Sequence, residues 1–151
     1  MPGECSALLG RAVYLDPASR ECLAVAKDWL HTCLSEHKKC NSSGASQRPL
    51  PTRVIDVGGE ACPPKIFNTN GKFGSYVALS YCWGGDSTFV LNVKTIGFLQ
   101  EGIPLADYPA TLRDAIIITR SLGIQYLWID ALCIRQDSAE EVSPSPIDLS
   151  S

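Results

Sequence analysis

The amino-acid sequence predicts an α/β fold, in which a parallel sheet built around a β-α-β unit follows an amphipathic N-terminal helix. Two apolar runs, at residues 76–83 and 126–134, have the length of strands that are buried on both faces. A helical pattern at residues 109–122 lies between them. Strands that are joined through a helix are usually parallel neighbours, so the three segments predict one β-α-β unit.

The composition is that of an ordinary globular protein and excludes several classes of function. The chain has 151 residues, of which 45% are hydrophobic and 19% are charged, which is enough for one domain. The net charge of -3 provides no basic surface for nucleic acid or an anionic membrane. No apolar run is long enough to cross a bilayer, and the first residues lack the pattern of a signal peptide. We therefore expect a cytoplasmic protein that binds neither nucleic acid nor membrane.

Residues 1–50 are predicted to form a helix followed by a linker. Asp16 and Pro17 are a typical N-cap and first helical residue, and the helical pattern continues to residue 38. The polar stretch 41–49 is typical of a linker. The apolar face of the helix consists of Cys22, Leu23, Ala26, Trp29, Leu30, Cys33 and Leu34.

Short strands are predicted ahead of the β-α-β unit. Residues 51–57 have a strand pattern that ends at two glycines, and residues 65–67 suggest an edge strand. Asn70-Gly71 is a typical hairpin turn.

The ends of the second helix also carry signals. Pro109 suits the first position of a helix, and Thr111 with Asp114 resembles a capping box. Gly123 is a typical C-terminal stop. The face predicted to be buried consists of Leu112, Ala115, Ile116, Thr119 and Leu122.

Two segments of the β-α-β unit resemble sequence blocks of one protein family. Residues 76–84 read YVALSYCWG, and residues 127–137 read LWIDALCIRQD. They are similar to the ALSYxWG and LWIDxLCIxQ blocks of the heterokaryon incompatibility (HET) domain of filamentous fungi. The resemblance covers about residues 51–138, including the connecting helix and the lead-in strand. It implies a role in self/non-self recognition after cell fusion and in the programmed cell death that follows.

The resemblance also implies a distant relationship to TIR domains, and hence a partial TIR-like or flavodoxin-like sheet. The family domain continues beyond the second block, so we expect residues 51–138 to be a truncated HET domain. Residues 1–50 would precede it, and the Ser- and Pro-rich residues 139–151 would form a disordered tail. TIR enzymes carry a catalytic glutamate on a later helix. No residue of this chain corresponds to it, Glu140 and Glu141 included, so we expect no catalytic residue and no enzyme activity.

The candidate ligand-binding site lies where the two parallel strands are predicted to end. In open α/β sheets ligands bind outside the carboxyl ends of the strands, and a Gly-Gly loop there lets backbone N–H groups approach a phosphate. The alternative interpretation is that Asp130 only fixes its own loop and the glycines only turn the chain. The candidate residues are Ser80, Tyr81, Gly84, Gly85, Asp86, Asp130, Gln136 and Asp137.

The cysteines suggest a weaker candidate for a metal site. The count of seven is odd, which favours free thiols over a disulfide framework. Cys33 and His37 are four residues apart on one helical face, and Cys40 follows, which is a partial zinc-ligand pattern with Cys62 as the nearest fourth ligand. The preferred interpretation is that Cys33 packs and His37 lies at the helix C-terminus, so that no metal or other cofactor is bound.

Nucleophilic catalysis by a cysteine is not favoured. Cys82 and Cys133 are predicted to lie within apolar strands that contain no histidine. Two alternatives to a HET-type signalling module remain: a TIR-like NAD-cleaving hydrolase and a small zinc-binding interaction module. The expected partners are other incompatibility or signalling proteins, with a nucleotide as a further candidate ligand.

Overall fold

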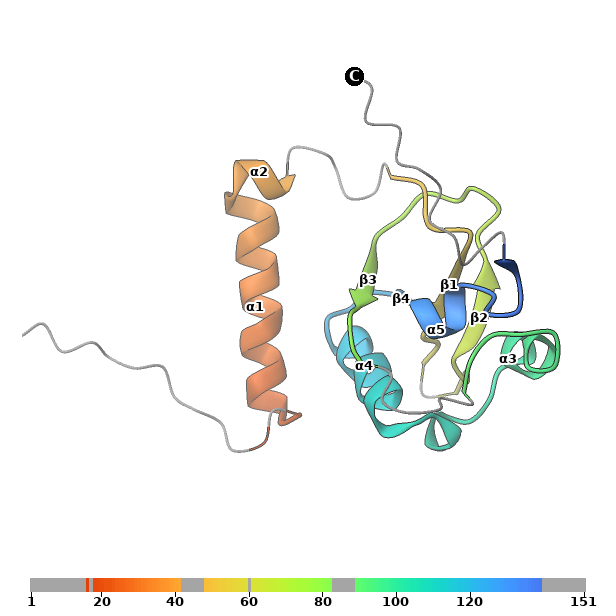
Figure 1. Cartoon of the computed structure of the whole chain (residues 1–151). Helices are drawn as coiled ribbons and strands as arrows, with labels where there is room; N and C mark the ends of the chain where they lie inside the picture. The colour runs from red at the N-terminus through yellow and green to blue at the C-terminus, as the bar shows by residue number, and fades with distance from the viewer. Residues whose placement is uncertain (1–15, 17, 42–47, 60, 83–88, 140–151) are drawn as a thin grey trace, which may run out of the picture.

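A four-stranded mixed sheet is the centre of the computed structural model, which describes residues 16, 18–41, 48–59, 61–82 and 89–139 (Figure 1). The strands are β1 (Arg53–Asp56), β2 (Lys65–Asn68), β3 (Tyr76–Leu79) and β4 (Tyr126–Ile129), in the order β2-β1-β4-β3. The sheet confirms the α/β class, although it is mixed and not wholly parallel, because β1 runs antiparallel to both its neighbours.

The predicted β-α-β unit is confirmed. Strands β3 and β4 are parallel neighbours, with Val77 opposite Leu127 and Leu79 opposite Ile129. The chain passes between them through α3 (Ile96–Glu101), a 3-10 turn (Leu105–Asp107) and α4 (Ala110–Ser121). A crossover of this kind is what parallel neighbours require, because a tight turn cannot join them.

The two faces of the sheet are covered by two different hydrophobic clusters. The larger core lies on the face that carries Ile55, Leu127 and Ile129, and α3, α4 and α5 (Asp130–Cys133) contribute to it. Along α4, Leu112, Ile116 and Thr119 are buried, as the helical pattern predicts, whereas Thr111 and Asp114 are exposed. A small cluster of Leu50, Val54 and Tyr126 covers the opposite face.

Strand β3 is less buried than the sequence predicts. Tyr76 is 41% exposed and Ala78 is also exposed, whereas Val77 and Leu79 pack against the larger core. The reason is that β3 is an edge strand and the small cluster on the opposite face extends over β1 and β4 but not over β3. The prediction that both strands are buried on both faces is right for β4 and wrong for β3.

The second apolar run does not continue as a strand to residue 134. It turns at Asp130 into the short helix α5, so Cys133 lies in a helical turn. Cys82 follows β3 and is exposed, so neither cysteine lies within a strand. The Asp130 carboxylate accepts a hydrogen bond from the backbone N–H of Ala131 at 2.7 Å, which stabilises this change from strand to helix.

Helix α1 (Arg20–Glu36) begins later than predicted. Ser19 is the N-cap, and its hydroxyl oxygen accepts a hydrogen bond from the N–H of Cys22 at 3.2 Å. Asp16 instead forms the preceding turn, where its carboxylate accepts from the N–H of Ala18 at 2.9 Å. The helix contacts α4 but buries none of its own residues, and Trp29 is 53% exposed. Figure 1 shows it standing beside the sheet domain.

Other local signals are confirmed only in part. Helix α4 has Pro109 as its N-cap with no side-chain cap hydrogen bond, so the expected capping box of Thr111 and Asp114 does not form. Gly123 ends the helix with a φ of 76°, as expected. Asn70 and Gly71 also adopt positive φ and form the expected turn, but it leads to an isolated bridge between Pro49 and Phe73 and does not join two neighbouring strands.

Several predictions fall on residues that the structure does not describe. They concern Pro17, most of the linker and the tail after residue 139. The six cysteines within the described ranges are free. No helix in the described part of the chain is long and apolar enough to cross a membrane.

Replacement of Ile116 by alanine is expected to destabilise the fold strongly. Ile116 is fully buried in the larger core, and removal of a buried isoleucine typically costs about 2–5 kcal/mol of unfolding free energy. Ile118 lies on the same helix but is 41% exposed, so Ile118→Ala is a matched control with an expected loss below about 1 kcal/mol. Urea unfolding of both variants measures the difference, and equal losses would show that α4 does not pack on the sheet through this face.

Candidate functional site

The carboxyl ends of β3 and β4 lie at the same end of the sheet. Leu79 and Ile129 are paired, so Ser80 and Asp130 follow them side by side. Ser80 is exposed and Tyr81 is half-buried. The pKa of Tyr81 is raised, first by its burial and second by the negative charge of Asp130. Ser80, Tyr81 and Asp130 therefore follow the ends of two neighbouring strands, and we call these three residues the strand-end site. Their role in binding a ligand stays a prediction.

Three candidate residues of this site lie outside the described residues. Gly84, Gly85 and Asp86 belong to the segment 83–88 that follows Cys82. The phosphate-binding role suggested for the two glycines therefore stays a prediction.

Asp130 has a structural role at the strand-end site. Besides the bond from the N–H of Ala131, its own carbonyl oxygen accepts from the N–H of Ile134 at 3.1 Å and from the Gln136 side chain at 3.2 Å. Asp130 therefore begins the α5 turn and also holds the residues that follow it. This arrangement favours the interpretation in which Asp130 fixes its own loop.

Gln136 and Asp137 hold the segment that leads into α3. The N–H of Gln136 donates to the carbonyl of Leu91 at 2.9 Å. The Asp137 carboxylate accepts from the N–H of Val93 at 2.8 Å and pairs with Arg135 at 3.2 Å. The Val93 N–H, followed by Arg135, lowers the pKa of Asp137, which keeps this exposed carboxylate charged. Asp137 therefore ties Val93 to the end of α5. Gln136 binds Leu91 through its backbone and also contacts the strand-end site, because its side chain donates to the carbonyl oxygen of Asp130.

Cys133 is unsuited to nucleophilic catalysis. Its side chain is 3% exposed, and burial raises the pKa of its thiol to about 12. Its sulfur accepts a weak hydrogen bond from the N–H of Ile129 at 3.4 Å. The nucleophilic form of cysteine is the thiolate, so a buried thiol that stays protonated at neutral pH is inert.

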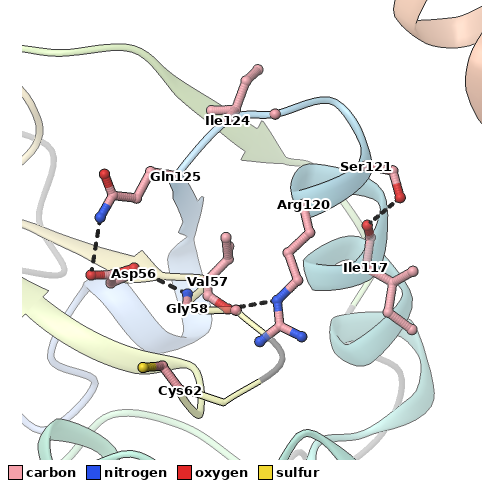
Figure 2. Close-up of a pocket in the computed structure, with 11 residues that line it drawn as sticks. Asp56, Val57, Gly58, Cys62, Ile117, Arg120, Ser121, Ile124 and Gln125 are labelled. Carbon is pink, nitrogen blue, oxygen red and sulfur yellow. Dashed lines mark hydrogen bonds between the residues drawn. The ribbon is translucent and has the colours of Figure 1, made fainter.

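A pocket lies at the other end of the sheet, beyond the end of β1 and the start of β4 (Figure 2). Its volume is about 830 Å³, and the C-terminal part of α4 forms one wall. Arg120 reaches from α4 to the opposite wall, where its Nε donates to the carbonyl of Val57 at 2.7 Å. The Asp56 carboxylate accepts from the N–H of Gly58 at 3.0 Å and from the Gln125 amide at 3.4 Å. The pocket thus offers one anchored guanidinium and one carboxylate.

Sequence reasoning missed this pocket because its walls come from distant parts of the chain. Arg120 belongs to the predicted helix and Gln125 to the residues just before β4, whereas Asp56 ends β1 and Gly58 follows that strand. The Gly58-Gly59 pair was the available signal, since a strand that ends in two glycines leaves room for a ligand.

Comparison with protein families gives one match. The model of the family described as heterokaryon incompatibility protein (HET) matches residues 76–145. The match begins at β3 and includes α4, β4 and the strand-end site, whereas β1, β2 and the β1 side of the pocket precede it. No curated protein and no solved structure matches the chain.

Replacement of Gly58 by alanine is expected to distort the wall of the pocket. Gly58 has a φ of +63°, and an added Cβ would lie 2.3 Å from the carbonyl oxygen of Cys62. Gly123, at the opposite wall, has a φ of +76° but open space around the same position. We expect Gly123→Ala to cost about 1–2 kcal/mol of unfolding free energy for its backbone conformation alone. Gly58→Ala should cost roughly 1–3 kcal/mol more because of the collision.

Chemical denaturation of the two alanine variants measures this difference. Losses of equal size would mean that Cys62 does not approach Gly58 as the structure has it.

Proposed function

We propose that this chain, in which residues 76–145 belong to the heterokaryon incompatibility (HET) family, acts as a recognition and signalling module that leads to cell death. The family match is the observation that carries the proposal. It includes both strands of the parallel pair and the helix that joins them, so it covers a structural unit and not an isolated motif. A function related to heterokaryon incompatibility follows from the family, and the signalling role is our more specific proposal.

The hydrogen bonds at the strand-end site favour binding over catalysis. A glycosidic bond such as the one to nicotinamide in NAD is cleaved with the help of a carboxylate beside the reacting carbon. Asp130 already accepts a backbone hydrogen bond that begins α5. This carboxylate therefore has a structural task, which supports a protein that recognises a partner without turnover.

The surface that we propose for this contact is the strand-end site. Ser80 is exposed there, and the half-buried Tyr81 follows it in the chain. The proposed partner is another incompatibility or signalling protein in the cytoplasm. Tyrosine suits such a contact because it combines a large apolar ring with one polar group.

Inducible expression of the full chain in a filamentous fungus tests the proposal. We expect loss of viability, measured by uptake of a vital dye and by colony counts. Leu127→Asp places a charge at a fully buried position and should abolish the effect by unfolding the domain. A chain that leaves viability unchanged, or an unfolded variant that kills equally well, would contradict the signalling role.

A matched pair of surface variants tests the strand-end site. Ser80 and Gln125 are both exposed and lie at opposite ends of the sheet. Ser80→Arg should abolish the loss of viability, because the larger charged side chain blocks the contact, and Gln125→Arg should preserve it. The reverse pattern would place the contact at the pocket end.

Incubation of the purified chain with NAD separates the signalling module from the hydrolase. We expect no release of nicotinamide, because the Asp130 carboxylate accepts the backbone hydrogen bond that begins α5. Release that disappears in Asp130→Ala would instead establish a catalytic role for Asp130.

A further inference from the structure

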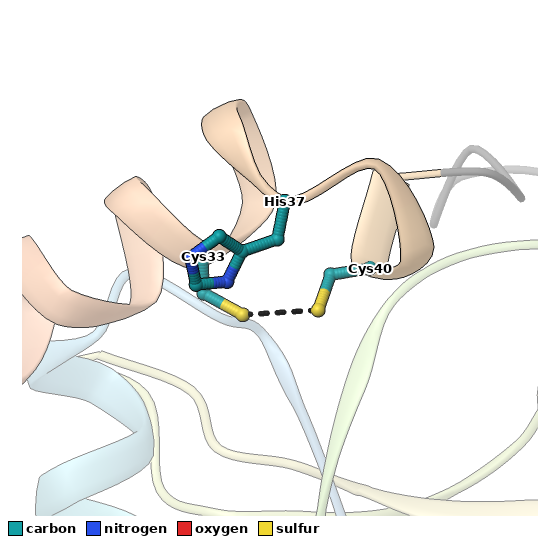
Figure 3. Close-up of side chains that lie close together, drawn as sticks. All are labelled: Cys33, His37 and Cys40. Atoms are coloured by element: carbon teal, nitrogen blue, oxygen red, sulfur yellow. Dashed lines mark hydrogen bonds between the residues drawn. The ribbon is translucent and has the colours of Figure 1, made fainter.

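Three potential metal ligands meet where α1 gives way to α2 (Lys38–Asn41). Helix α1 ends at Glu36, and His37 has the extended backbone angles φ −88° and ψ 106°. The extended residue changes the direction of the chain, and α2 packs back against α1. As a result Cys33 and Cys40, which lie in different helices, come together beside the His37 ring, with their sulfur atoms facing each other (Figure 3).

The three side chains converge closely. One ligand atom from each of Cys33, His37 and Cys40 lies within 4.8 Å of the other two, and the two sulfurs are 3.2 Å apart. Backbone hydrogen bonds support the arrangement: the N–H of His37 donates to Cys33 at 3.3 Å, and the N–H of Cys40 donates to His37 at 2.9 Å. These two hydrogen bonds connect the backbone of His37 to that of Cys33 and the backbone of Cys40 to that of His37.

The sulfur separation is closer to that of a metal site than to that of a disulfide. A tetrahedral zinc ion bound about 2.3 Å from each sulfur separates the two by about 3.8 Å. A disulfide needs about 2.05 Å. The observed distance between the sulfurs is 3.2 Å. To bind zinc they would move apart by about 0.6 Å, whereas to form a disulfide they would approach by about 1.2 Å, roughly twice as far. A disulfide would also leave the neighbouring histidine without a role.

We propose that Cys33, His37 and Cys40 bind a zinc ion, and that a water molecule completes its tetrahedral coordination. Two thiolates and one imidazole are a ligand set that zinc favours. Binding replaces the two thiol protons, which pass to solvent. The zinc ion and two thiolates together carry no net charge, so the adjacent Lys38 and Lys39 do not oppose binding.

The exposure of the site explains why water is the fourth ligand. His37 and Cys40 are exposed, and Cys33 is only partly covered. Among the residues that the structure describes, the group contains these three side chains and not Cys62, the fourth ligand suggested by the sequence. A zinc ion with three protein ligands keeps one coordination position open to exchange.

The zinc ion has a clear structural consequence. Helix α1 has no buried residue, and α2 is only four residues long, so side-chain packing holds their junction weakly. A metal bound by Cys33 of α1 and Cys40 of α2 connects the two helices. The preferred interpretation from the sequence, in which Cys33 packs in the helix face, accounts for neither the partial exposure of Cys33 nor the approach of Cys40.

Metal analysis of the full chain tests the proposal. The chain is purified under reducing conditions, loaded with zinc, dialysed and analysed by mass spectrometry for its metal content. We expect one zinc ion per chain, and replacement by cobalt should produce the thiolate-to-cobalt charge-transfer band of a tetrahedral site. Because α1 buries no residue, variants at the site should keep the fold, which the near-ultraviolet circular dichroism of the sheet domain verifies.

Matched variants identify the ligands. Cys33→Ser, His37→Ala and Cys40→Ser should each lose the zinc and the cobalt band. Cys62→Ser and His31→Ala replace exposed residues of the same two types outside the group and should retain both. Zinc that survives His37→Ala, or that is lost equally in the controls, would overturn the assignment. So would a chain without zinc in which Cys33 and Cys40 are found joined in a disulfide.

Discussion

The pairing of β1 with β4 is the interaction on which the rest of the sheet domain depends. It places Ile55 opposite Leu127, and both side chains are fully buried. Without it, β4 would have a neighbour on one side only, and the hydrogen-bonding groups of its other edge would be open to solvent. Further bonds reinforce the pairing from both ends: the Arg53 side chain donates to the carbonyl of Cys133 at 3.0 Å, and Arg120 donates to Val57 at 2.7 Å.

The β1–β4 pairing joins a strand inside the family match to a strand that precedes it. The matched segment begins at Tyr76 and contains β3 and β4, whereas β1 and β2 precede it. The pocket exists only because β1 ends beside the start of β4, and the strand-end site lies at the other end of β4. Residues 48–75 are therefore part of the folded unit, although the family match does not include them.

Local patterns in the sequence were enough to predict the parallel pair and its helix. The two apolar runs and the stripe that includes Leu112 and Ile116 have the periodicity of the elements that they form. The exposed face of β3 was not predictable in this way, because it depends on how far the cluster around Leu50 and Tyr126 extends. The turn at Asp130 was missed because the residues after it are apolar and continue the strand pattern.

The candidate sites also differ in how far local sequence patterns predict them. Ser80 and Asp130 follow neighbouring strands at the same end of the sheet because the strands are parallel, which the β-α-β pattern implies. The pocket depends on an antiparallel neighbour that no local signal identifies. For the proposed zinc site, the helical spacing of Cys33 and His37 was visible, but the approach of Cys40 depends on the extended backbone of His37. Helical periodicity cannot predict that angle.

The unfolding of two shortened chains tests the central claim most directly. One begins at residue 48 and keeps β1 and β2, and the other begins at residue 75, and both continue to residue 151. Since α1 buries none of its residues, its removal should matter little, and we expect the chain from residue 48 to unfold cooperatively in urea. The chain from residue 75 should lack a cooperative transition, because β4 has lost its partner on one side. A cooperative transition of equal midpoint in both chains would contradict the dependence of the fold on the β1–β4 pairing.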